Sequence, residues 1–138
     1  HTLPNHQRLP PASGQVSFLD PEMLPHLALL PDLLEELTSG AAYSPIAAAF
    51  VDGQPVAFCY AGSQTETLWD VAIDTLAAHR RQGHAAHSAA FLIRHFHAQD
   101  LRPVWQALEE NRASWRLAEK LGFMPVDELA FFEPKRQD

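Results

Sequence analysis

Disulfides and membrane-spanning segments are both missing from this sequence. Its 138 residues include one cysteine, Cys59, so no internal disulfide can form. A lone thiol suits a reducing compartment, and we expect a cytoplasmic protein. No apolar run approaches the ~20 residues that cross a bilayer, and the first residues lack the basic and apolar regions of a signal peptide. Because the chain starts with His1 and not with Met, we expect a fragment or a processed chain.

Basic residues are also scarce. The chain has 10 Lys and Arg against 17 Asp and Glu, which gives a formal net charge of -7 at pH 7. This charge repels phosphate backbones, so we expect no nucleic-acid partner, and without a long apolar run we expect no membrane partner. A cationic substrate would be attracted. Length and composition predict a loose arm over 1–14, rich in Pro and polar groups, and a single domain over 15–138.

Hydrophobic periodicity and turn residues predict alternating strands and helices. Asp20 can cap a helix, and Pro25 and Pro31 divide the leucine-rich stretch that follows into two short helices. Asp52-Gly53 between two apolar runs predicts a hairpin. The predicted elements are a strand at 15–19, two helices between 20 and 37, strands at 46–51, 56–61 and 65–75, a helix at 82–99, a strand at 103–108, a helix at 111–121, and strands at 123–126 and 129–132. This order is typical of an α/β domain with helices on both faces of its sheet.

Several of these elements have a side that we expect to be buried. The predicted strand 65–75 has two different sides. Its apolar side is formed by Trp69, Val71 and Ile73, and its acidic side by Glu66, Asp70 and Asp74. The predicted helix 82–99 has one apolar face, formed by Ala85, Ala89, Leu92 and Phe96. We expect Trp69 and Trp105 to pack in the core and Cys59 to be a buried, unreactive thiol.

The segment from Arg80 to Ala85 joins a predicted strand to a predicted helix and is suited to an anion. Backbone N–H groups and the helix dipole at the start of a helix favour a group such as pyrophosphate. Gly83 lets a ligand approach the backbone closely, and the small Ala85 does not obstruct it. The guanidinium groups of Arg80 and Arg81 add positive charge in an otherwise acidic chain.

Two motifs in the second half of the chain carry a family resemblance. Arg80, Gly83 and Ala85 form the pattern Arg-x-x-Gly-x-Ala, and residues 111–123 have the sequence NRASWRLAEKLGF. The first resembles the acetyl-CoA signature of the GCN5-related N-acetyltransferase (GNAT) superfamily. The second resembles that family's Asn-x-x-Ala/Ser helix, which ends in Lys-Leu-Gly-Phe. The resemblance covers residues 46–132 well, and it implies an α/β GNAT-like fold with a twisted mixed sheet of about six or seven strands flanked by helices.

The resemblance also implies that acetyl-CoA is the cosubstrate. In this family acetyl-CoA lies in an opening between the fourth and fifth strands. The backbone of the fourth strand contacts the pantetheine arm, the following loop holds the pyrophosphate, and the start of the next helix reaches the pantetheine region. The residues that this implies are Val71, Ile73, Thr75, Arg80, Arg81, Gln82, Gly83, His84, Ala85, Asn111 and Ser114.

The implied reaction is direct attack of an amine on the thioester, which requires a general base. Asp70 is the first candidate, because it lies on the acidic side of the strand where many family members carry Glu. Glu66 and Asp74 share that side, and Glu109 is the second choice. At the position where the family often has a Tyr that protonates the leaving thiolate, this chain has Ala118, which cannot donate a proton.

The same residues have less specific interpretations. Gly83 can be an ordinary turn residue, Asn111 is a good helix cap without any cofactor, and Asp70 can be a solvated residue or a partner of Arg80. The histidines between 79 and 97 lack an acid or cysteine that would complete a metal site at sensible spacing.

Three functions therefore remain open at this point. The first is an N-acetyltransferase for an amine on a small molecule or peptide. The second is a regulatory or assembly module that binds CoA or acyl-CoA without catalysis, which the replacement of the family's Tyr by Ala118 favours. The third is a plain α/β domain with accidental matches. The leucine-rich stretch also offers a surface for a homodimer.

Overall fold

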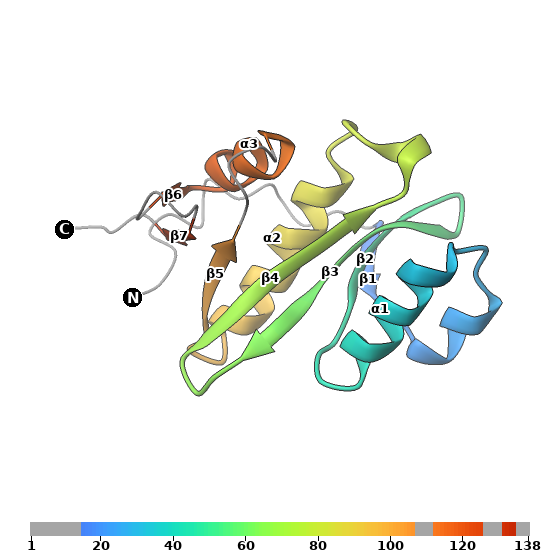
Figure 1. Ribbon diagram of the computed structural model, residues 1–138, viewed down its shortest axis with the longest axis horizontal. Helices are drawn as coiled ribbons and strands as arrows, with labels where there is room; N and C mark the ends of the chain where they lie inside the picture. The colour runs from blue at the N-terminus through green and yellow to red at the C-terminus, as the bar shows by residue number, and fades with distance from the viewer. Residues whose placement is uncertain (1–14, 107–111, 126–130, 135–138) are drawn as a thin grey trace.

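A mixed sheet forms the centre of the molecule (Figure 1). The computed structural model describes residues 15–106, 112–125 and 131–134. Its strands are β1 (Val16–Phe18), β2 (Ala47–Val51), β3 (Gln54–Gln64), β4 (Leu68–Thr75), β5 (Arg102–Gln106), β6 (Phe123–Pro125) and β7 (Phe131–Pro134). The order across the sheet is β1-β2-β3-β4-β5-β7-β6. Strands β1 to β5 form the main sheet. The end of β5 pairs with the short strand β7, which in turn pairs with β6.

Helices cover both faces of the sheet, as predicted. The 3-10 helix η2 (Pro21–His26) and α1 (Pro31–Ala41) lie on one face, and α2 (His84–His97) lies on the other. A short 3-10 helix, η3 (Ala77–His79), precedes α2, and α3 (Arg112–Lys120) contacts β6. None of the helices in the described ranges is both long and apolar enough to cross a membrane.

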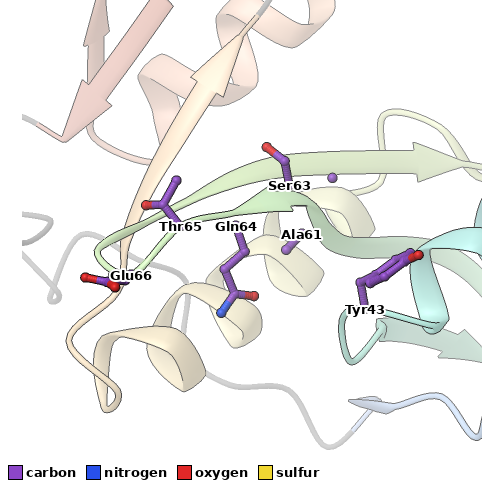
Figure 2. A pocket seen from close by; sticks show the side chains of 7 residues that line it. Tyr43, Ala61, Ser63, Gln64, Thr65 and Glu66 are labelled. Carbon is purple, nitrogen blue, oxygen red and sulfur yellow. The ribbon is translucent and has the colours of Figure 1, made fainter.

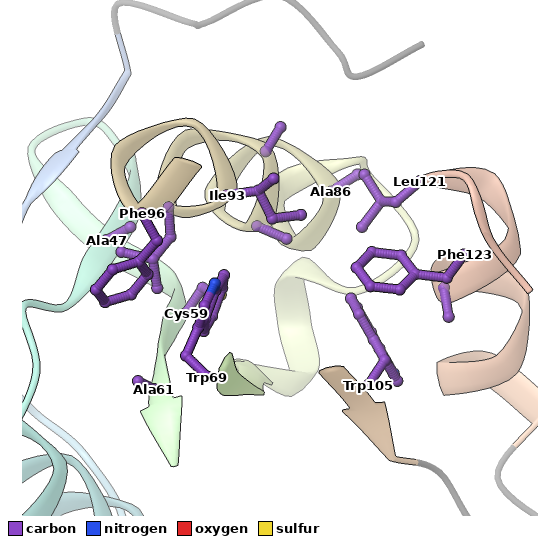
Figure 3. Packing of buried hydrophobic residues seen from close by; sticks show 14 of the residues in the cluster. Ala47, Cys59, Ala61, Trp69, Ala86, Ile93, Phe96, Trp105, Leu121 and Phe123 are labelled. Atoms are coloured by element: carbon purple, nitrogen blue, oxygen red, sulfur yellow. The ribbon is translucent and has the colours of Figure 1, made fainter. Parts of the chain in front are cut away.

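Each face of β4 meets a different apolar cluster, which confirms the predicted alternation. Trp69, Val71 and Ile73 belong to the cluster beneath α2, whereas Ala72 packs in the cluster beneath α1. Trp69 and Trp105 are both buried in the first cluster, where the Trp69 ring lies against Phe96 with centroids 4.7 Å apart (Figure 3). The acidic side of β4 therefore faces α1, opposite the side that α2 covers.

Local chemistry explains where several elements begin and turn. Asp52 and Gly53 have φ of 51° and 78°, the left-handed conformations that a two-residue hairpin loop requires, so the predicted turn is confirmed. The Asp20 side chain accepts a hydrogen bond from the Glu22 N–H at 3.0 Å and caps η2. Pro31 is the first residue of α1, where its missing N–H has no cost.

Three details differ from the predictions. The helix after Asp20 is a 3-10 helix that ends at His26, because Pro25 lies inside it. The buried face of α2 includes Ala86 and not Ala85. Periodicity shows that the helix has an apolar face, but the position of the sheet determines which residues at the edge of that face are buried. Glu66 lies in the turn before β4 and not on its acidic side, because the strand begins at Leu68.

Candidate functional site

Strands β4 and β5 separate partway along their length. They pair in parallel at Leu68, Trp69 and Asp70, opposite Arg102, Pro103 and Val104. From Val71 to Thr75, β4 keeps its pairing with β3, but no further pairing with β5 is formed within the described residues. Figure 1 shows the two strands diverging from the lower left of the view. Backbone N–H and C=O groups along this part of β4 are thus available for a ligand, as an unpaired strand edge requires. This stretch contains the predicted residues Val71, Ile73 and Thr75.

The loop that follows β4 presents backbone donors at the start of α2. Gly83 precedes the helix with φ 86° and ψ -1°, and Arg81, two residues earlier, also has a left-handed φ of 63°. Left-handed residues beside right-handed ones turn consecutive N–H groups toward one point, which makes an anion-binding concavity. No side chain caps the first turn of α2. The N–H groups and the helix dipole therefore favour an anion at Gly83 to Ala85.

The backbone conformation at Gly83 gives a further reason for a glycine, besides the close approach of a ligand that we predict. A Cβ at this position would meet only His87 Cε1, at 3.9 Å, so the protein itself does not crowd it. The positive φ is what disfavours any other residue. Near Gly83, Arg80 donates from Nε to the carbonyl oxygen of Thr75 at 3.3 Å, which ties the loop to the end of β4. Gln82 Oε1 and His84 Nε2 form a hydrogen bond of 3.2 Å.

Asp70 lies where the opening between β4 and β5 begins. The Ser63 hydroxyl donates to Asp70 Oδ2 at 2.7 Å. Ser63 belongs to a bulge in β3, where the register shifts between Ala61 and Gln64 opposite Asp70. Bulges of this kind redirect side chains and are frequent beside active sites. The hydrogen bond from Ser63 therefore helps to hold the candidate base at the last paired position of β4.

A hollow lies along β3 beside this bulge. It has a volume of about 640 Å³ and is lined by Tyr43 and by the residues from Ala61 to Glu66 (Figure 2). Its lining includes Ser63, which contacts Asp70, and the exposed Glu66 and Tyr43. The hollow thus adjoins the bulge that orients Asp70 and is large enough for a small organic molecule.

A second acidic group lies further along β4, and sequence reasoning did not identify its partners. The Tyr60 hydroxyl donates to Glu36 Oε1 at 2.6 Å, and the Glu36 carboxyl lies close enough to Asp74 to act on its ionisation. Burial, followed by the charge and hydrogen bond of Glu36, raises the pKa of Asp74 to about 6, and Arg80 opposes this effect. Burial, followed by the bond to Glu36, also raises the pKa of Tyr60. The cluster formed by Glu36, Tyr60 and Asp74 connects α1 to the separated part of β4.

Some predicted residues lie beyond what the structure describes. Glu109 and Asn111 are outside the described residues, and Ser114 lies in α3 without a described side chain. Ala118 is fully buried in the larger apolar cluster. Cys59 is also fully buried, and burial raises its thiol pKa, as expected for an unreactive core thiol. Among the described residues, no group of three or more His, Cys, Asp or Glu side chains could hold a metal ion.

The comparisons with known proteins agree with this geometry. The sequence model of the GNAT acetyltransferase family matches residues 47–132, which is more than half of the chain. The chain belongs to the GNAT acetyltransferase family. This match includes both β4 and the loop that precedes α2. Curated protein sequences yield no match.

Solved structures with a similar fold are acetyltransferases. An acetyltransferase from Salmonella typhimurium that modifies the N-terminal serine of ribosomal protein L7/L12 has a TM-score of 0.69 at 13% identity, covering 85% of both chains. An aminoglycoside N-acetyltransferase in complex with CoA has a TM-score of 0.67 at 20% identity, covering 88% of this chain and 99% of its own. An N-acetyltransferase from Staphylococcus aureus has a TM-score of 0.64 at 19% identity, covering 81% and 84%. At these identities, the likeness establishes the fold of this GNAT domain and not its substrate.

Proposed function

We propose that this GNAT domain transfers the acetyl group of acetyl-CoA to an amine by direct attack on the thioester. The observation that carries the proposal is the separation of β4 from β5, which starts at Asp70 and leads to the anion-binding loop at Gly83. The six residues of extended strand from Asp70 to Thr75 span ~17 Å. An elongated ligand with a phosphate at one end can therefore bind along β4 with its other end near Asp70.

The residues of the opening fit acetyl-CoA. The backbone of Val71, Ile73 and Thr75 can bond to the amide groups of the pantetheine arm, as a further strand would. The N–H groups from Arg81 to Ala85 can hold the pyrophosphate, with the Arg80 and Arg81 charges nearby. Acetyl-CoA supplies the activated acetyl thioester. Ser114 in α3 and Asn111, which precedes α3 in the sequence, remain proposed contacts.

Asp70 is the proposed general base. The amine nitrogen forms a bond to the thioester carbonyl carbon, the carbon–sulfur bond breaks with its electron pair on sulfur, and Asp70 takes the proton from nitrogen directly or through water. Its hydrogen bond from Ser63 holds one carboxylate oxygen in place. Glu109 remains the second choice. Because Ala118 cannot donate a proton, the thiolate must be protonated by another group or by water.

The cofactor site is tested by comparing Gly83→Glu with Gly83→Ala in calorimetric titrations with acetyl-CoA. Both variants bear the cost of a side chain at φ 86°, about 1–2 kcal/mol. Only Glu places a carboxylate beside the N–H groups that would hold pyrophosphate. We expect Ala to weaken binding about tenfold and Glu to weaken it by at least about tenfold more. Equal affinities of the two variants would show that the phosphate does not bind at this loop.

The catalytic assignment is tested by Asp70→Asn. Loss of a general base should lower turnover by about 10²-fold or more, while affinity for acetyl-CoA stays nearly unchanged because Asn has the same size. Asp100→Asn, an exposed position in the loop before β5, is the matched control. Turnover of Asp70→Asn equal to that of the control at every pH would eliminate Asp70 as the base.

The alternative function is a module that binds CoA or acyl-CoA without catalysis. The observation in its favour is Ala118, which is fully buried and provides no acid at the position where the family often has Tyr. A panel of primary amines, assayed with acetyl-CoA for release of the free CoA thiol, separates the two. An enzyme releases the thiol with at least one amine, and a binding module releases it with none.

The proposal extends to partners and compartment. The acceptor is an amine on a small molecule or peptide, and no nucleic acid or membrane takes part. Met23 in η2 is 40% exposed, and Leu30, the residue before α1, is 78% exposed. The two helices contact each other, and these exposed apolar side chains support a homodimer through the face that η2 and α1 form. The unpaired Cys59 thiol supports a cytoplasmic location. Sedimentation of the wild type and of Leu30→Glu at several concentrations tests the dimer.

A further inference from the structure

Three imidazoles surround the loop that leads into α2. His79 ends η3, His84 begins α2, and His87 lies one turn further along that helix. The rings of His79 and His84 have centroids 6.2 Å apart. His87 Cε1 lies 3.9 Å from the position that a Cβ on Gly83 would take. All three side chains are partly exposed, so none of them is closed off from a ligand in solvent.

In the part of the chain that the structure describes, these imidazoles form no ion pair with a carboxylate that would stabilise a positive charge. Within the described residues, their hydrogen bonding is limited to the contact between His84 and Gln82, which is neutral. Burial, followed by the charges of His79 and His87, lowers the pKa of His84. The other charged groups that the structure describes at this end of β4 and α2 are Arg80 and Arg81 in the loop and Asp74 on β4. Asp74 interacts electrostatically with Glu36 of α1 and with Arg80.

An anion bound at this loop would reverse these effects. A nearby negative charge favours the protonated imidazole, and an imidazolium has two N–H donors for charge-assisted hydrogen bonds to phosphate. On the basis of the proposed function, which places pyrophosphate at this loop, we propose that His79, His84 and His87 bind the phosphate groups of acetyl-CoA as imidazolium ions. Binding then transfers protons from the solvent to imidazole nitrogens, and no other bond forms or breaks.

The pH dependence follows from linkage. Because the imidazole pKa is higher in the complex than in the free protein, affinity is greatest below the free pKa and falls as the pH rises toward the pKa of the complex. A rise of one pKa unit in a single histidine changes the affinity about tenfold. Ionisation of the phosphate monoester of CoA acts in the opposite direction, since its second negative charge forms as the pH rises through about 6. The two effects must therefore be separated.

The experiment is calorimetric titration of the whole chain with acetyl-CoA from about pH 5.5 to pH 8. Each titration is repeated in two buffers of different ionisation enthalpy, which gives the number of protons taken up. Acetyl-CoA that lacks the 3′-phosphate monoester is the second ligand, because its pyrophosphate does not titrate in this range. The variants are His79→Gln, His84→Gln and His87→Gln. The matched control is His97→Gln at the other end of the same helix.

We expect net proton uptake and an affinity that falls about tenfold or more between about pH 5.5 and pH 8 with the ligand lacking the monoester. Gln in place of His84 should reduce both effects, whereas His97→Gln should leave both unchanged. Binding without proton uptake in the wild type would refute the inference and leave the acetyl-CoA site standing. Absence of binding at every pH would instead refute the proposed function. If a variant fails to fold, a lack of proton uptake by the wild type still refutes the inference.

Discussion

Replacing Asp74 by Asn should stabilise this GNAT domain at alkaline pH and not at acid pH. Burial, followed by the Glu36 carboxyl, raises the pKa of Asp74 from an ordinary value of 3.8 to about 6. The folded protein therefore binds the proton of Asp74 more tightly than the unfolded chain does. Its contribution to stability is fully present below about pH 4, declines as the pH rises, and is lost above about pH 6. An Asn side chain keeps the size of Asp without its charge.

The size of the effect follows from the pKa change. At about 1.4 kcal/mol per pKa unit, a rise from 3.8 to about 6 corresponds to about 3 kcal/mol against the ionised form. Asp74 is only partly buried, so solvent screening reduces this value, and we expect about 1 kcal/mol. The partner also matters, because the Asn amide can donate to the Glu36 carboxylate where an ionised Asp74 cannot.

The assay is denaturant unfolding of wild type and Asp74→Asn from about pH 4 to pH 8. The free energies of unfolding should agree near pH 4 and diverge above pH 5, with the variant about 1 kcal/mol more stable at pH 8. Asp52→Asn in the exposed hairpin turn is the matched control, and it should give no such divergence. A difference that is constant with pH, or a variant that is less stable at pH 8, would refute the reasoning.

Two further predictions concern packing in the core. Gly40→Ala should destabilise the fold by about 1–3 kcal/mol despite the higher helix propensity of Ala, because its Cβ would lie 2.7 Å from Tyr60 Cδ2. Gly62→Ala, whose Cβ would meet Ala72 Cβ at 3.7 Å, should be nearly neutral; similar thermal midpoints for both variants would contradict this. Cys59 should react with a thiol reagent only on unfolding, and rapid modification of the native protein would show that its burial is wrong.

The elements that the sequence predicted well depend on neighbouring residues. The hairpin at Asp52-Gly53 needs only two left-handed residues between apolar runs, and η2 begins where Asp20 can accept from a nearby N–H. The loop before α2 is equally local, because Gly83 provides its positive φ and the helix that follows begins with N–H groups that no side chain caps. The two sides of β4 were also predicted correctly, since side chains alternate along any strand.

The errors arose where position depends on another part of the chain. Ala85 was expected on the buried face of α2, but the sheet covers Ala86. The apolar face of a helix is broad, so the sequence pattern alone does not fix which of two adjacent residues at its edge is buried. Glu66 was expected on the acidic side of β4, but it lies in the turn because β4 begins at Leu68. The cluster of Glu36, Tyr60 and Asp74 had no signal in the sequence, because its members come from three separate elements.

By itself, the sequence determined the α/β class, the order of most elements, the family motifs and the loop at Gly83, because periodicity, capping and turn chemistry act over a few residues. Tertiary structure alone decided where β4 leaves β5, which hydroxyl holds Asp70, and which carboxyl raises the pKa of Asp74. Those features depend on the register and divergence of strands and on a helix packed across them. Such contacts between distant segments leave no periodic pattern in the chain.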